Sequence, residues 1–122
     1  MNRRIIGLVS VFVAAVALVA VVQAHMKIEK TDPADGATLG TAPTSVQLFL
    51  SEKPDLKVTK VEVVGASGKV TLGAAHMMGE KTLMAPVTGK MADGKYTVSW
   101  QTAGDDGHVQ KGTFAFSVKH AE

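Results

Sequence analysis

Hydrophobic residues alternate with polar or small ones through most of the chain beyond residue 25, and this period of two restricts the fold more than any other feature. In a β-strand, successive side chains point to opposite faces, whereas an amphipathic helix repeats its apolar residues about every 3.6 positions. The alternation is clearest in residues 46–50, 96–100 and 114–118, and residues 58–64 form a fourth run rich in β-branched side chains. We therefore predict four strands in these places and almost no helix among them.

Three weaker runs, residues 26–30, 70–74 and 82–86, bring the expected number of strands to about seven. Short segments with glycine or aspartate separate the runs, as tight turns require. These segments are residues 35–36, 65–68, 93–94 and 104–107. Short strands at this spacing predict an all-β fold, a small antiparallel Greek-key β-sandwich or barrel of the immunoglobulin-like kind.

The first 24 residues have the pattern of a secretory signal peptide. Arg3 and Arg4 precede an uncharged apolar run over residues 5–22, and the small-residue ending 22–24 favours cleavage after Ala24. An uncleaved membrane anchor is the alternative, because 18 apolar residues are close to the minimum for a membrane span. We predict a signal helix over residues 1–24, followed by one exported domain over residues 25–122.

Charge and composition exclude several classes of partner for that domain. The whole chain has 13 basic and 11 acidic residues, and two of the basic residues are Arg3 and Arg4, so residues 25–122 carry 11 of each. Without a basic excess, nothing predicts binding to nucleic acid or to an anionic membrane. The chain has no cysteine, which excludes disulfides and thiolate metal sites.

A possible metal site begins at the predicted processing point. Cleavage after Ala24 would give His25 a free α-amino group beside its imidazole, so one residue would offer two nitrogen ligands. Residues two apart in an extended segment face the same side, so Asp106 and His108 can add a carboxylate and a second imidazole. Asp105 is the alternative carboxylate. Adjacent residues in an extended chain face opposite sides, so Asp106, two residues before His108, is the one expected on the same side as His108. This set of three nitrogens and one oxygen suits a tetragonal Cu(II) ion.

With these residues in view, the sequence resembles the CopC-type copper-binding proteins of the bacterial periplasm. The matching segments, in chain order, are His25 after Ala24, residues 32–39 (DPADGATL), 42–43 (AP), 46–52 (VQLFLSE), 93–100 (DGKYTVSW), 106–108 (DGH) and 112–118 (GTFAFSV). The resemblance implies a small Greek-key β-sandwich that binds Cu(II) through His25, Asp106 and His108. It also implies that Glu52 is a hydrogen-bond partner behind the ligands, where a carboxylate would orient the N–H groups of a metal-bound amine or imidazole.

The same resemblance implies a role in copper homeostasis or resistance in the periplasm, often alongside an inner-membrane copper-uptake protein. We expect a monomer that carries copper without catalysis. Two other functions stay open at this point. One is a copper redox enzyme with a histidine brace, and the other is a metal-free β-sandwich that binds other proteins.

Some family members carry a methionine-rich segment that binds Cu(I), whose softness suits thioether sulfur. The nearest counterpart here is His76, Met77 and Met78, with Met84 following. Because the first three are adjacent rather than spaced two apart on one strand face, we expect no tight Cu(I) site. We expect His120 to lie in an exposed tail.

Overall fold

The computed structural model describes residues 26–120; the predicted signal segment, His25 and the last two residues lie outside the described part. The described residues form nine strands and one short 3-10 helix, η2. They are β1 (Ile28–Asp32), β2 (Thr38–Leu39), β3 (Ser45–Leu50), η2 (Leu56–Val58), β4 (Lys60–Gly65), β5 (Gly68–Val70), β6 (His76–Met77), β7 (Thr82–Pro86), β8 (Gly94–Ala103) and β9 (Val109–Val118). Within residues 26–120, no helix is long and apolar enough to cross a membrane.

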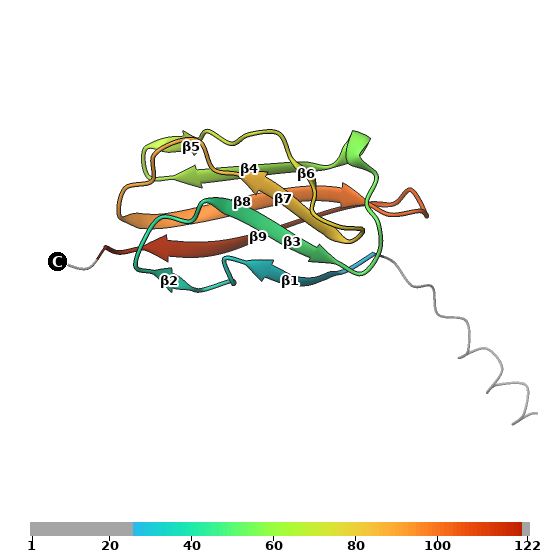
Figure 1. The fold of residues 1–122 in the computed structure, drawn as a ribbon, viewed down its shortest axis with the longest axis horizontal. Coiled ribbons are helices and arrows are strands. Elements are labelled where there is room, and N and C mark those ends of the chain that lie inside the picture. Colours follow the sequence, from blue (N-terminus) through green and yellow to red (C-terminus); the bar gives the residue numbers. More distant parts are fainter. Residues whose placement is uncertain (1–25, 121–122) are drawn as a thin grey trace, which may run out of the picture.

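The strands form two sheets that pack face to face (Figure 1). One sheet has four strands in the order β1-β3-β7-β6, and the other has five in the order β2-β9-β8-β4-β5. The chain passes from one sheet to the other after β1, β2, β3, β5 and β7, which is the connectivity of a Greek-key sandwich rather than of a simple meander. The predicted all-β sandwich is therefore confirmed.

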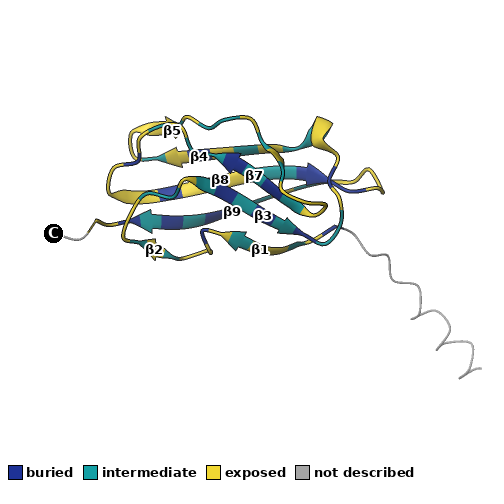
Figure 2. Ribbon diagram, in the orientation of Figure 1, coloured by how far each residue is buried: buried dark blue, intermediate teal, exposed yellow. Residues whose placement is uncertain are grey.

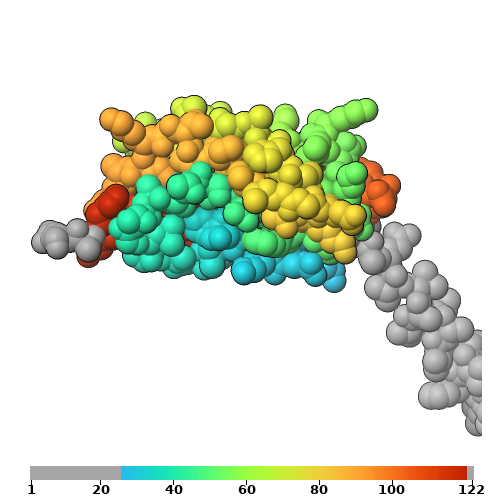
Figure 3. Space-filling view, viewed as in Figure 1, coloured from blue at the N-terminus to red at the C-terminus, as the bar shows by residue number. Residues whose placement is uncertain are grey.

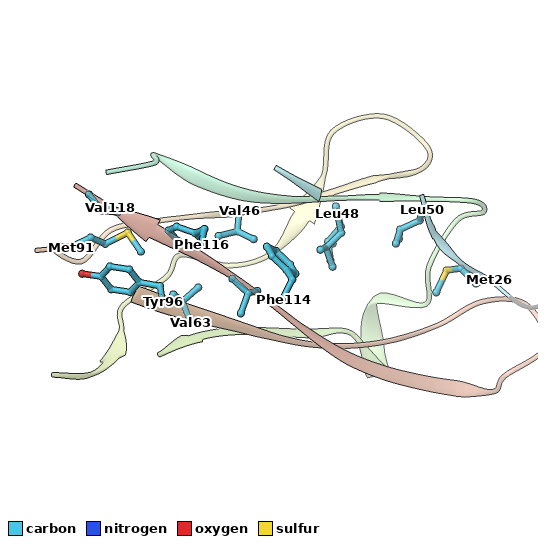
Figure 4. Packing of buried hydrophobic residues seen from close by; sticks show 12 residues of the cluster. Met26, Val46, Leu48, Leu50, Val63, Met91, Tyr96, Phe114, Phe116 and Val118 are labelled. Carbon is cyan, nitrogen blue, oxygen red and sulfur yellow. The ribbon is translucent and has the colours of Figure 1, made fainter. Parts of the chain in front are cut away.

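The core lies between the sheets and is built from the alternate residues that the sequence pattern singled out. Val46, Leu48 and Leu50 of β3 are each 1% exposed, and they share one core cluster with Val98, Phe114 and Phe116 of the other sheet. Figure 4 shows the side chains of Val46, Leu48, Phe114 and Phe116 between the sheets. Figure 2 shows the same alternation of buried and more exposed residues along the long strands. Burying side chains of this size contributes roughly 1.5–3 kcal/mol each, so the alternation determines which face of each strand turns inward.

The structure differs from the predicted strands in several places. It has nine strands rather than about seven, because the short strands β2 and β6 were not expected, and the strand expected over residues 26–30 is β1, residues 28–32. β2 pairs with β9 in parallel, so the five-stranded sheet is mixed rather than wholly antiparallel. Residues 70–74, expected as one strand, contribute only the end of β5 and a single bridge between Leu72 and Val87. The strand expected from Val58 begins at Lys60, because Asp55 caps η2 by accepting a hydrogen bond from the Lys57 N–H.

Candidate metal centre

The hairpin between β8 and β9 carries the predicted Asp-x-His pair in its loop. The two strands pair in unbroken antiparallel register from Gly94–Val118 to Ala103–Val109, so residues 104–108 form a short connection at the end of a long, rigid ribbon. Within the loop, the Gly107 N–H donates to the Gly104 carbonyl at 3.1 Å. Gly107 has a φ of +74°, a left-handed conformation that glycine adopts without strain.

Asp106 and His108 lie together in this loop, as the sequence predicts. Asp106 Oδ1 accepts a hydrogen bond from the His108 backbone N–H at 3.1 Å, and Asp106 Oδ2 lies 3.4 Å from His108 Nδ1. The His108 side chain is 67% exposed and the Asp106 side chain 30%, so solvent reaches both groups. Strand alternation had been the predicted reason for their proximity. The actual reason is an Asx turn, in which the aspartate side chain bonds the backbone two residues on.

Glu52 reaches the same loop from the end of β3. Its Oε1 accepts a hydrogen bond from the Asp105 backbone N–H at 3.0 Å. A Cβ atom at Gly104 would overlap Glu52 Oε1, so the carboxylate lies directly against the loop backbone and would have to move if residue 104 carried a side chain. Glu52 therefore anchors the loop through a main-chain N–H. The role of Glu52 behind the metal ligands stays a prediction. Nothing in the sequence indicated Gly104, because its close approach to Glu52 joins residues 52 positions apart.

The beginning of the described chain packs at this site too. Met26 is 1% exposed and belongs to the core, and a Cβ at Gly104 would lie 3.2 Å from Met26 Cβ. Lys27 exchanges two hydrogen bonds with Ser51, through its N–H to the serine hydroxyl at 2.8 Å and through its carbonyl to the serine N–H at 2.9 Å. Figure 1 shows the start of β1 and the β8–β9 loop at the same end of the sandwich. The chain just after His25 is thus held against the loop that carries Asp106 and His108.

Asp105 and Asp106 have different roles in the geometry of the loop. Asp105 contributes its backbone N–H to Glu52, whereas the carboxylate of Asp106 faces His108. Among residues 26–120, no group of three or more histidine, cysteine, aspartate or glutamate side chains is placed to hold a metal ion. His25, the third predicted ligand, lies outside the described residues.

The other residues singled out from the sequence lie elsewhere. His76 and Met77 form β6, on the edge of the four-stranded sheet, where His76 pairs with Met84 and Met77 with Leu83 of β7. His120 is exposed, as expected of a tail, but it is held in place: its N–H donates to Asp93 Oδ1 at 3.1 Å, and its Nδ1 makes a second, short hydrogen bond to the same oxygen. The side-chain hydrogen bond from His120 is the main cause that lowers the pKa of the Asp93 carboxyl.

Comparison with known proteins agrees with this architecture. The protein is 32% identical over 124 residues to copper resistance protein C of Xanthomonas campestris pathovar juglandis, a match that covers 95% of this chain and 97% of the relative. It is 30% identical over 101 residues to protein YobA of Escherichia coli K12, covering 80% of this chain and 82% of YobA.

Solved structures show the same fold. The crystal structure of PcoC, described as a methionine-rich copper resistance protein from Escherichia coli, superposes with a TM-score of 0.71 at 24% identity, covering 79% of this chain and all of PcoC. CopC from Methylosinus trichosporium OB3b gives a TM-score of 0.72 at 20% identity, covering 80% of this chain and 97% of that protein. In addition, the profile of the CopC domain matches residues 28–119. The resemblance noted in the sequence is confirmed, and the chain belongs to the CopC domain family.

Proposed function

We propose that this protein binds one Cu(II) ion through His25, Asp106 and His108 and carries copper in homeostasis or resistance, without catalysing a reaction. The relative from Xanthomonas is named a copper resistance protein, and so is the structural neighbour PcoC, which supports copper as the metal. The observation that carries the proposal is that Met26 packs against Gly104, in the loop of Asp106 and His108.

Covalent geometry links this packing to His25. Consecutive Cα atoms are about 3.8 Å apart, so a ligand at residue 25, next to the buried Met26, would be within reach of the loop. Once cleavage frees its amine, His25 would add two nitrogen ligands to the carboxylate and imidazole of the loop. Three nitrogens and one oxygen favour Cu(II), which also stands at the top of the divalent affinity order.

The exposure of His108 favours a carrier over an enzyme. A site at the tip of a hairpin, with one ligand 67% exposed, lets a partner approach the ion directly. We therefore place the histidine-brace enzyme second, and the metal-free module third, because the Asp106–His108 pairing offers metal donors that such a module would not need.

The predicted signal segment supports export to the periplasm, with the working chain starting at His25. A copper carrier in that compartment would exchange its ion with an inner-membrane copper-uptake protein, and we propose that the carrier acts as a monomer. Mass spectrometry of the exported protein, with and without Cu(II), reports the cleavage point, the stoichiometry and the number of chains together.

The decisive experiment compares Cu(II) affinity in protein that starts at His25 with protein that starts at Ala24. The extra residue converts the amine into an amide, a poor donor, and opens the chelate ring. We expect far weaker Cu(II) binding by the longer protein in a chelator competition at constant pH. Thermal melts of the metal-free forms are the control and should coincide, since the addition is terminal. Equal affinities would remove the amine from the site and overturn the proposed ligand set.

A further inference from the structure

The outer face of the five-stranded sheet brings together basic side chains that are far apart in sequence. β4 pairs with β8, and β8 with β9, so Lys60, Gln101 and Lys111 lie side by side in one row across three strands. Val63 of β4 and Val98 of β8 have the opposite parity and are buried in the core. Because successive side chains of a strand point to opposite faces, the row points away from the core, toward solvent.

Charge is divided unequally between the two faces of the sandwich. On the outer face of the five-stranded sheet, strand alternation places four lysines and one glutamate, namely Lys60, Glu62, Lys69, Lys95 and Lys111. On the other sheet, the outward positions of the two central strands are uncharged, namely Ser45, Gln47, Phe49, Thr82, Met84 and Pro86. Figure 3 looks onto that second face, with β1 in blue and β3 in green. The equal numbers of acidic and basic residues in the domain therefore conceal one basic face.

The carboxylate on this face is already paired, whereas two of its lysines are not. Glu62 Oε1 lies 3.3 Å from Lys69 Nζ. Within residues 26–120, neither Lys60 nor Lys111 has an ion pair, and both side chains are exposed. The ammonium groups of these two lysines are thus available to an external anion.

A groove of about 470 Å³ runs between the two lysines. Ser99, Gln101 and Thr113 contribute hydroxyl and amide groups to its lining. The Gln101 side chain is oriented, because its Nε2 donates a hydrogen bond to the Val58 carbonyl at 3.0 Å. Its Oε1 can therefore accept a hydrogen bond from an incoming N–H, and the two hydroxyls can donate or accept. The groove can bind peptide groups as well as negative charge.

The composition of the face favours a protein segment over a lipid surface. Peripheral membrane binding combines basic charge with apolar side chains that enter the bilayer, commonly Trp, Phe or Leu. The exposed large hydrophobic residues at the outward positions of this sheet are Val64 and Val109, whose side chains are short. A flat membrane would also leave the hydrogen-bonding groups of the groove unused.

We propose that this face docks an extended acidic segment of a partner protein, with Lys60 and Lys111 as its charged contacts. Neighbouring strands are about 4.8 Å apart, so the Cα atoms of the two lysines, two strands apart, are separated by about 10 Å. Alternate side chains of an extended peptide share a face and are about 7 Å apart, a difference that the flexible lysine stems can close. The segment should therefore carry acidic residues at every second position.

The test is an NMR titration of the isotope-labelled exported protein with the acetylated peptide Glu-Thr-Glu-Thr-Glu-Thr. The amide signals of Lys60, Gln101 and Lys111 should shift, as should the indole N–H signal of Trp100, the only tryptophan, which also lines the groove. Signals of β3 and β7 should stay in place. The uncharged peptide Gln-Thr-Gln-Thr-Gln-Thr should not bind. Affinity for the acidic peptide should fall as salt is raised from about 20 to about 300 mM, because salt screens exposed charges.

Charge-removing variants test the two contacts. Lys60→Gln and Lys111→Gln should each weaken binding of the acidic peptide about two- to fivefold, and the double variant about tenfold, as expected of exposed ion pairs. Lys81→Gln is the matched control, since it removes the same charge from an exposed position between β6 and β7. It should bind the peptide like the unaltered protein.

Several outcomes would overturn the docking surface. They are the absence of binding, equal binding of the glutamine peptide, an equal loss in Lys81→Gln, or signal shifts confined to other faces. Vesicles of phosphatidylglycerol should leave the protein in solution on sedimentation, and binding to them without binding to the peptide would assign the face to lipid. His108→Ala should bind the peptide normally, and the lysine variants should keep their Cu(II) affinity, so this surface and the proposed copper site can fail separately.

Discussion

The carboxylate of Glu52 accepts a hydrogen bond from the backbone N–H of Asp105 at 3.0 Å, across 53 positions of sequence. This contact joins the end of β3 in one sheet to the β8–β9 loop of the other, and it helps to hold the loop that carries Asp106 and His108. Hydrogen bonds that involve a charged group are worth about 1.5–3 kcal/mol where they are shielded, and less when solvent reaches them.

Glu52→Ala should therefore weaken Cu(II) binding by about tenfold, because the loop loses its anchor and must be ordered when the ion binds. Glu52→Gln keeps an accepting oxygen and should retain most of the affinity. The measurement is a Cu(II) chelator competition, with hydrogen exchange at the Asp105 amide as an independent readout. If Gln and Ala weaken binding equally, the negative charge matters rather than the anchoring bond.

Gly104→Ala should destabilise the protein by about 1 kcal/mol, because the Glu52 carboxylate must move away and give up its hydrogen bond with the Asp105 N–H. The new Cβ overlaps Glu52 Oε1 and crowds Met26, so the loop, the carboxylate or the start of the chain must shift. Gly40→Ala is the matched control, because nothing lies within 4 Å of its Cβ position, and it should melt like the unaltered protein. The double variant Gly104→Ala with Glu52→Ala should recover part of the loss, and the absence of any recovery would mean that Glu52 is not the obstacle.

His108→Ala should lower Cu(II) affinity by roughly 100-fold or more, since even partners behind the ligands are commonly worth 10–100-fold. Asp106→Ala should cause a smaller loss, because a carboxylate contributes charge compensation but a weaker ligand field than an imidazole nitrogen. Affinities come from competition titration, and the visible d–d absorption band reports the change in ligand set. A larger loss for Asp106→Ala than for His108→Ala would contradict this ranking.

Cu(II) should displace Zn(II) from the protein at equal concentrations. Zinc prefers tetrahedral sites and stands below copper in the affinity order, whereas the predicted donors suit a tetragonal ion. A competition titration followed by metal analysis of the desalted protein tests the preference. Equal retention of the two metals would point to a site without the N-terminal amine.

The contact between Asp93 and His120 should make stability depend on pH in the acid range. Hydrogen bonding to His120 lowers the pKa of the Asp93 carboxyl in the folded protein, so the folded state binds fewer protons than the unfolded state as this group titrates. The stabilisation is present above the unfolded pKa of about 3.9 and is lost as the pH falls through the lower folded value.

Melting curves between pH 6 and pH 2 test this contact. Asp93→Asn and His120→Gln should both lower the melting temperature at pH 6, and the difference from the unaltered protein should shrink towards pH 2. The two single variants and the double variant should give the same curve, because each removes the same interaction. Additive effects in the double variant would show that the two residues act separately.

The sequence by itself determined the β-sandwich and the nature of its core. Alternation along residues 46–50 and 114–118 depends only on the local geometry of an extended chain, and a shift by one residue would expose Leu48 or Phe116 to water. Proximity of Asp106 to His108 was equally predictable, since both belong to one five-residue loop. The Asx turn formed by Asp106 and His108 was harder to predict, because the conformation of a loop depends on which backbone N–H and carbonyl groups the flanking strands leave available for hydrogen bonding.

Tertiary structure alone decided the contacts between distant segments. Glu52 meets Asp105, and Met26 meets Gly104, because the two sheets pack with these ends together. His76 meets Met84 because the β6–β7 register pairs them, and nothing in the adjacency of residues 76–78 indicates that pairing. Periodicity tells which face a side chain occupies, whereas the register between strands, which follows from packing the whole core, determines which side chains it faces.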